Sequence, residues 1–157
     1  MDYSYLKLIH LFAVMLFLGN IVTGLFWMRI AVKTKDLKII SFTMKGIITA
    51  DKYFTIPGVL VITAGGFLAA IYGHFPILHT GWILWSIIMF SISGLAFAFK
   101  VVPLQKKIYN LSLSKDTEPD FDWKYFSKVY LAWDIWGFIA LLTPLAAFVM
   151  MILKIPQ

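Results

Sequence analysis

An apolar stretch near the start of the chain limits it to a membrane protein. Residues 5–29 are interrupted by few polar side chains, chiefly Lys7, His10, Asn20 and Thr23. The stretch exceeds the roughly 20 residues that a helix needs to cross a hydrocarbon core of about 30 Å. An imidazole inside such a span is costly unless it faces other helices and finds a partner, a metal or a cofactor. His10 is therefore the first candidate functional residue.

The composition supports the same class of protein. Of the 157 residues, 61% are hydrophobic and 14% are charged, which is more apolar and less charged than a soluble domain. At about 20 residues per span plus connections, this length predicts four spans in one transmembrane domain covering residues 1–157. The chain has no cysteine, which excludes disulfides, thiolate catalysis and cysteine-ligated iron–sulfur clusters.

Four apolar segments alternate with basic or polar connections. The spans are expected at about 5–30, 53–72, 82–102 and 129–153. Between the first two, a mixed basic and apolar segment predicts a short amphipathic helix lying at the membrane surface. Pro103 is expected to end the third span, because proline disrupts a helix interior, and residues 104–127 are expected to form a solvated loop.

The basic residues are distributed unevenly along the chain. Six Lys and Arg lie between positions 29 and 52, six lie between 100 and 128, and none lies between 73 and 81. By the positive-inside rule, both long connections are cytoplasmic, and both termini and the 73–81 loop are outside. The predicted fold is an all-α, up-down-up-down four-helix bundle. Because the net charge of +6 is explained by these flanking residues, nucleic acid is not an expected partner.

All three histidines lie on the predicted outer side. His10 is about five residues inside the outer end of the first span, and His74 and His79 lie in the outer loop. His10 is a candidate metal or haem ligand, or else a buried histidine bonded to a serine, a backbone carbonyl or water. His74 and His79 are candidates for a second ligand, or else ordinary interfacial residues. No span carries an HxxxH pair, so a metal site on a single helix is not predicted.

Three charged residues are expected to meet at the inner side. Arg29 ends the first span, Asp51 begins the second and Asp134 lies early in the fourth. Because an intramembrane carboxylate prefers a nearby cation and one guanidinium can serve two carboxylates, we predict a structural clamp, with a proton or ion relay as the alternative. Trp133 and Trp136, on the same helix as Asp134, are candidates for lining a flat cofactor pocket.

The first span carries a series of residues that resembles a known helix. Lys7-Leu-Ile-His10 is followed by Leu18-Gly19 and then by Leu25-Phe26-Trp27-Met28-Arg29. This series resembles the opening helix of the HemJ-type protoporphyrinogen oxidases, small bacterial haem-binding membrane proteins that read roughly K-x-L-H, A-G-L-F-Y and P-R. A lysine of the third helix that is thought essential in that family is replaced here by Ser86. The resemblance therefore implies haem binding but not the same oxidase reaction.

A closer resemblance is to a family of bacterial predicted integral membrane proteins of unknown function, the domain-of-unknown-function family 2269. The residues that carry it are His10, Gly19 and the series Ala50-Asp51-x-x-Phe54-x-x-x-Gly58. This resemblance implies the fold and a location in the bacterial inner (cell) membrane. It draws attention to His10 and Asp51 without naming a reaction.

Two functions of different classes follow from these observations. The first is a b-type haem protein (haem b) with a redox or electron-transfer role, in which His10 is an axial ligand and Gly19, Trp133 and Trp136 line the cofactor. Its expected partners are the lipid bilayer and either a second copy or a membrane redox partner. The alternative is a non-enzymatic accessory or structural subunit without a cofactor. A transporter is less well supported, because no internal symmetry or pair of broken helices is evident.

Overall fold

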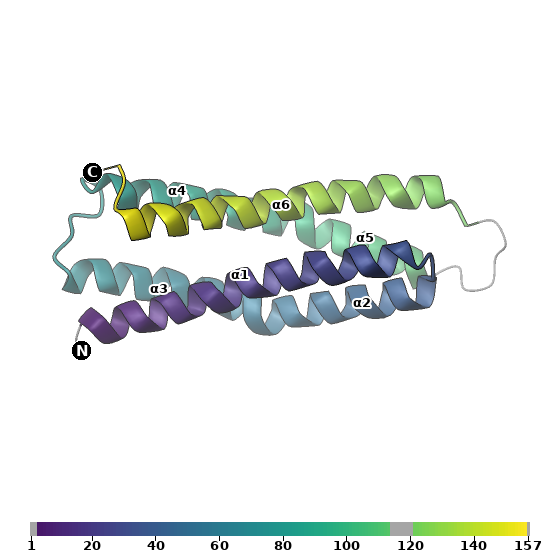
Figure 1. Ribbon diagram of the computed structural model, residues 1–157, viewed down its shortest axis with the longest axis horizontal. Coiled ribbons are helices and arrows are strands. Elements are labelled where there is room, and N and C mark those ends of the chain that lie inside the picture. The colour runs from purple at the N-terminus through teal and green to yellow at the C-terminus, as the bar shows by residue number, and fades with distance from the viewer. Residues whose placement is uncertain (1–2, 114–120, 157) are drawn as a thin grey trace.

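The computed structural model describes residues 3–113 and 121–156. All secondary structure within these residues is helical. Four stretches are long and apolar enough to cross a membrane: Tyr3–Lys33, Leu37–Tyr72, Gly81–Leu113 and Trp123–Leu153. The stretches lie side by side along the long axis, and both ends of the chain are at the same end of the molecule (Figure 1). The all-α membrane fold predicted from the sequence is confirmed.

The second and third stretches are each built from two α-helical segments joined by a π-helical turn. The first and fourth stretches are single α-helices. In chain order the elements are α1 (Tyr3–Lys33), α2 (Leu37–Ala50), η1 (Asp51–Thr55), α3 (Ile56–Tyr72), α4 (Gly81–Ala96), η2 (Phe97–Val101), α5 (Val102–Leu113) and α6 (Trp123–Leu153).

Each π turn is followed by an α-helix whose second residue is proline. Pro57 follows η1 and Pro103 follows η2. A proline ring clashes with the carbonyl group four residues earlier, and these carbonyls belong to Tyr53 and Phe99, which lie inside the two π turns. The wider π turn relieves this clash locally and lets the helix continue. Pro103 therefore does not end the third stretch, contrary to the sequence-based prediction.

The segments that flank the π turns also differ from the prediction. α2 does not lie apart as a surface helix, because it continues into α3 and packs against α1 and α5. Its Ile40 and Met44 are completely buried by these neighbours. α5 occupies the first part of the expected 104–127 loop and packs against α2 and α6. Residues 114–120 of that expected loop lie outside the described residues.

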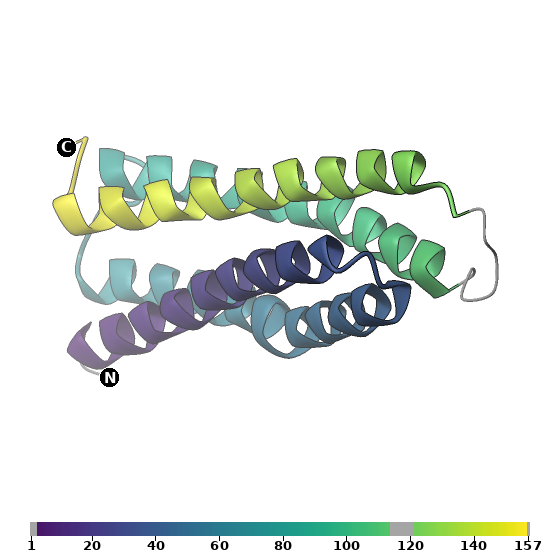
Figure 2. The same ribbon diagram turned by 45° about the vertical axis from the view of Figure 1, so that its right-hand side comes forward.

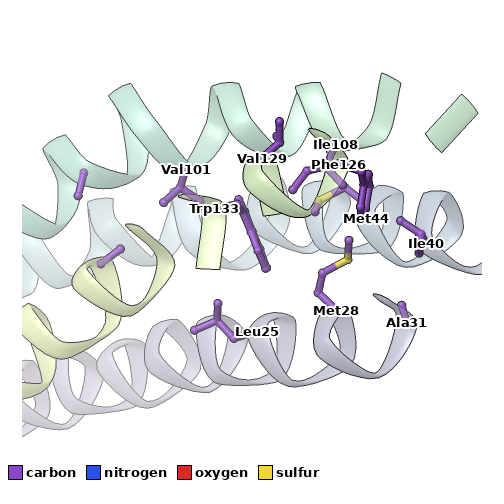
Figure 3. Close-up of a cluster of buried hydrophobic side chains, with 12 residues drawn as sticks. Leu25, Met28, Ala31, Ile40, Met44, Val101, Ile108, Phe126, Val129 and Trp133 are labelled. Atoms are coloured by element: carbon purple, nitrogen blue, oxygen red, sulfur yellow. The ribbon is translucent and has the colours of Figure 1, made fainter. Parts of the chain in front are cut away.

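The main apolar core lies at the end of the bundle that is remote from the termini. Here α1, α2, α5 and α6 come together, and Figure 3 shows Leu25 and Met28 of α1 facing Met44 of α2 and Trp133 of α6. The other buried members of this core are Ala31, Ile40, Ala96, Val101, Ile108, Phe126, Val129 and Ala140. The four helical stretches are therefore held together mainly at this end, which we call the inner end.

At the opposite end, which we call the outer end, the helices form two separate pairs. α1 packs against α3, and α4 packs against α6, while α3 makes no backbone contact with α4 or α6 in the described part of the chain. The two pairs diverge toward the termini in both views (Figures 1 and 2). The rings of Phe17 and Phe90, with centroids 5.7 Å apart, join α1 to α4 near the point of divergence.

Large apolar side chains cover the outside of the bundle. Phe12, Trp27 and Phe99, for example, are 61%, 55% and 71% exposed. A soluble protein rarely exposes apolar surface so extensively, whereas helices whose backbone groups are bonded internally suit a hydrocarbon environment. The side chains on this surface are therefore in contact with the lipid bilayer.

Candidate functional site

Three polar side chains on α1 mark three sites at different depths. His10 lies toward the outer end, Asn20 near the middle and Arg29 toward the inner end. At 1.5 Å per residue, the first two are about 15 Å apart along the helix and the last two are about 14 Å apart. Each makes a hydrogen bond or ion pair with a different helical element, so the three sites are structurally separate.

His10 joins α1 to α3 at the outer end. Its Nδ1 lies 2.9 Å from the carbonyl oxygen of Ile62, and only 8% of the residue is exposed. Because a carbonyl oxygen can only accept, Nδ1 carries the hydrogen and donates it, which leaves the lone pair of a neutral imidazole on Nε2. A backbone carbonyl that holds one ring nitrogen is the usual support of a metal-ligating histidine.

Two glycines of α3 provide the space for His10. A Cβ at Gly66 would lie 3.1 Å from Cε1 of the imidazole, and a Cβ at Gly65 would lie 3.4 Å from Cβ of His10. The close approach of α1 and α3 therefore depends on the absence of a side chain at both positions. Gly19 differs, because a Cβ there would meet nothing within 4 Å. It is nine residues from His10, or about two and a half turns, and so lies on the opposite face of α1.

The second site is centred on Asp51, which is 8% exposed. Its Oδ1 accepts hydrogen bonds from Asn20 Nδ2 at 2.9 Å and from Thr55 Oγ1 at 2.7 Å. Its Oδ2 accepts a hydrogen bond from Gln105 Nε2 at 2.7 Å. Asn20 Nδ2 also lies 2.9 Å from Thr55 Oγ1. We call these four residues the Asp51 cluster; they connect α1, η1 and α5 in the middle of the bundle.

The two π turns place the members of the Asp51 cluster. Asp51 and Thr55 are the first and last residues of η1, and Gln105 lies one turn beyond η2. π-helical turns are rare and occur frequently at functional sites. Because both turns border the same cluster, this part of the bundle is a candidate binding site.

A small cavity adjoins the Asp51 cluster where the two helix pairs diverge. Its volume is about 20 Å³, which is enough for one water molecule. The hydroxyl-bearing residues Thr55 and Ser93 contribute to its wall. The remaining lining residues are Phe17, Ile21, Val59, Phe90, Gly94, Phe97 and Ala140. The cavity is therefore a small and mainly apolar space that meets the Asp51 cluster at Thr55.

The third site is an ion pair between α1 and α6. Arg29 Nη2 lies 2.9 Å from Asp134 Oδ2, and the guanidinium stacks over the ring of Phe138 at 4.9 Å from its centroid. The side chain of Arg29 is 49% exposed, as expected for a clamp at the edge of a bundle. The structure thus divides the predicted cluster of Arg29, Asp51 and Asp134. Asp51 bonds to Asn20, which lies about 14 Å from Arg29 along α1.

The comparisons with known proteins identify the family. A family model described as a predicted integral membrane protein (DUF2269) matches residues 4–155. The chain belongs to this family. No curated protein and no solved structure matches it. The assignment to DUF2269 made from the sequence is therefore confirmed, while the resemblance to the HemJ-type oxidases stays a prediction.

The DUF2269 structure does not bring the two predicted tryptophans to His10. Trp133 is buried in the inner core beside Leu25 (Figure 3), and Trp136 lies beneath Lys100 Nζ at 5.5 Å. Leu25 is about 22 Å beyond His10 along α1. Trp133 and Trp136 therefore cannot share a pocket with His10, and neither can Gly19 on the opposite face.

The other histidines of the DUF2269 chain are exposed. His74 and His79 lie in the turn between α3 and α4, whereas His10 is buried. In the described part of the chain, no group of three His, Asp or Glu side chains is placed to hold a metal ion. A haem makes a smaller demand, because its porphyrin already holds the iron and one histidine can serve as the protein ligand.

Three members of the Asp51 cluster were missed by the sequence analysis. Asn20 was treated as an ordinary interruption of an apolar span, Thr55 was not singled out, and Gln105 was assigned to a loop. The four-residue spacing of Asp51 and Thr55 was a usable signal, because such residues are neighbours on a helix. Gln105 would have required knowledge that the helix continues past Pro103.

Proposed function

We propose that this DUF2269 protein is a b-type haem-binding membrane protein with a redox or electron-transfer role and with His10 as an axial ligand. The observation that supports the proposal is the bond from His10 Nδ1 to the Ile62 carbonyl oxygen at 2.9 Å. This bond orients the buried imidazole. In the neutral ring it leaves the lone pair on Nε2, which is the state that coordinates iron.

The position of the His10 imidazole is set by α3. Its Nδ1 is held by the Ile62 carbonyl oxygen, and Gly65 and Gly66 let the imidazole lie against α3. A bound haem would supply the electron-transfer chemistry. The residues of the chain would hold and orient it and exclude water. His74 and His79, both exposed, are the proposed sources of a second ligand.

A second candidate function is favoured by how the helix pairs are held. His10 donates to a carbonyl of α3, and Ser93 Oγ similarly donates to the Ala140 carbonyl oxygen of α6 at 2.6 Å. If His10 is only an interhelical clamp of this kind, the protein is an accessory or structural subunit without a cofactor. This alternative predicts a colourless protein that associates with itself or with a membrane partner.

An absorption spectrum of the detergent-purified protein distinguishes the two functions. We expect a Soret band, sharp α and β bands after reduction with dithionite, and about one haem per chain in a pyridine haemochrome assay. The protein should be produced in cells supplied with a haem precursor, so that cofactor supply is not limiting. A flat visible spectrum under these conditions would contradict haem binding and favour the accessory subunit.

We further infer that the protein lies in the bacterial inner membrane with both termini and the turn between α3 and α4 outside. The support is the positive-inside rule, since 12 of the 14 Lys and Arg lie in the two long connections of the sequence analysis. Because the chain has no cysteine, Leu78→Cys and Lys35→Cys provide single labelling sites at opposite ends of the bundle. A membrane-impermeant maleimide should label whole cells carrying Leu78→Cys but not Lys35→Cys; the reverse pattern would contradict this orientation.

A further inference from the structure

When it is ionised, the Asp51 carboxylate carries a charge that none of its hydrogen-bond partners balances. It lies near the middle of the bundle and accepts three hydrogen bonds, all from uncharged groups. The ion pair between Arg29 and Asp134 lies about 14 Å from the Asp51 cluster along α1. An ionised carboxylate inside a membrane span is expensive without a cation. If the cluster served only to link helices, a neutral side chain would make comparable bonds without this cost.

We propose that the Asp51 cluster binds one sodium ion. Asp51 offers two carboxylate oxygens, Thr55 offers a hydroxyl oxygen, and Asn20 and Gln105 each carry an amide oxygen beside the nitrogen that now points at Asp51. A half-turn of each amide exchanges its nitrogen for its oxygen. The side chains that cap the carboxylate can therefore rotate to form an oxygen-only shell around a hard cation.

The charge of the site selects a monovalent ion. One carboxylate and three neutral side chains balance a single positive charge, whereas a divalent ion would leave a net charge in the hydrocarbon region. The cavity of about 20 Å³ beside Thr55 admits only a single small species. This size favours a sodium ion over a large organic cation such as choline.

The cavity adjoins the cluster at Thr55. Its wall also includes Phe17 and Phe90, whose rings join α1 to α4 with centroids 5.7 Å apart. Sodium sites in transporters lie near the membrane midplane, where regular α-helix is interrupted. In this protein η1 and η2 interrupt the α-helical hydrogen bonding beside the cluster without breaking the helix.

The experiment measures the melting temperature of the full-length, detergent-purified protein in sodium chloride and in choline chloride at equal ionic strength. We expect a saturable rise with sodium that reaches about 4 °C at ten times the dissociation constant. Asp51→Asn keeps the shape of the side chain but removes its charge, and should abolish the rise. The matched control Asp134→Asn removes a carboxylate outside the cluster and should retain it.

Radioactive sodium bound to the wild-type protein provides a readout that does not depend on any variant folding. We expect about one ion per chain, displaced by unlabelled sodium but not by choline. Equal melting temperatures in the two salts, with no bound sodium, would overturn the proposal. So would a sodium effect that persists in Asp51→Asn, since sodium would then act elsewhere. The test is independent of haem, because His10 lies about 15 Å away along α1.

Discussion

Asp51→Ala is expected to lower the free energy of unfolding by about 3 kcal/mol. The substitution removes the common acceptor of Asn20, Thr55 and Gln105. A buried donor that loses its acceptor costs about 1–3 kcal/mol in soluble proteins, while hydrogen bonds between transmembrane helices average about 0.6 kcal/mol. Three donors are affected at once, so these values give a total between about 2 and about 9 kcal/mol. We expect a value near the lower limit, because the cluster lies between transmembrane helices.

The size of this effect can be measured by unfolding in mixed micelles of increasing sodium dodecyl sulfate content, followed by circular dichroism. Two variants calibrate it. Asp51→Asn retains an oxygen acceptor and should lose about 1 kcal/mol. Asp134→Ala breaks an ion pair whose arginine is half exposed and should be less destabilising than Asp51→Ala. If Asp51→Ala is no more harmful than Asp134→Ala, the cluster does not support the bundle.

The positions of the four spans could be predicted because they depend on local composition. Apolar runs of sufficient length define a span wherever they occur, and they placed the four stretches. The beginning of the second span was missed because the basic segment before residue 53 was predicted to be a surface helix. The end of the third was missed because Pro103 was expected to stop the helix. A proline usually marks the beginning or end of a helix, but here a π turn before each proline lets the helix continue.

The contents of the candidate sites were harder to predict, because they depend on how helices pair. The sequence indicated that His10 is buried and either bonded to a group such as a backbone carbonyl or coordinating a metal. That the carbonyl is that of Ile62 depends on the register of α1 against α3. Arg29 and Asp51 were grouped by charge. Their depths differ by about 14 Å along α1, once Asp51 is placed beside Asn20. The charges of these residues do not reveal how deep in the bundle each one lies.

His10→Ala is expected to reduce the haem content of the purified protein by about tenfold or more. The substitution removes the proposed ligand nitrogen together with the bond to Ile62. The measurement is the pyridine haemochrome value per chain, compared with wild type. His74→Ala and His79→Ala are matched controls on exposed residues; at least one should keep its haem, since at most one of the two serves as second ligand.

A reduced haem content could also follow from a weakened α1–α3 contact, and two further measurements separate these causes. His10→Gln can still donate to the Ile62 carbonyl oxygen, because its amide carries N–H groups, but it offers iron no imidazole. We expect it to fold with near wild-type stability and to lack haem. Free imidazole added to His10→Ala during haem loading should restore the Soret band, because the space left by the side chain can accept it. If His10→Gln retains haem, His10 is a clamp between α1 and α3 and the ligand lies elsewhere.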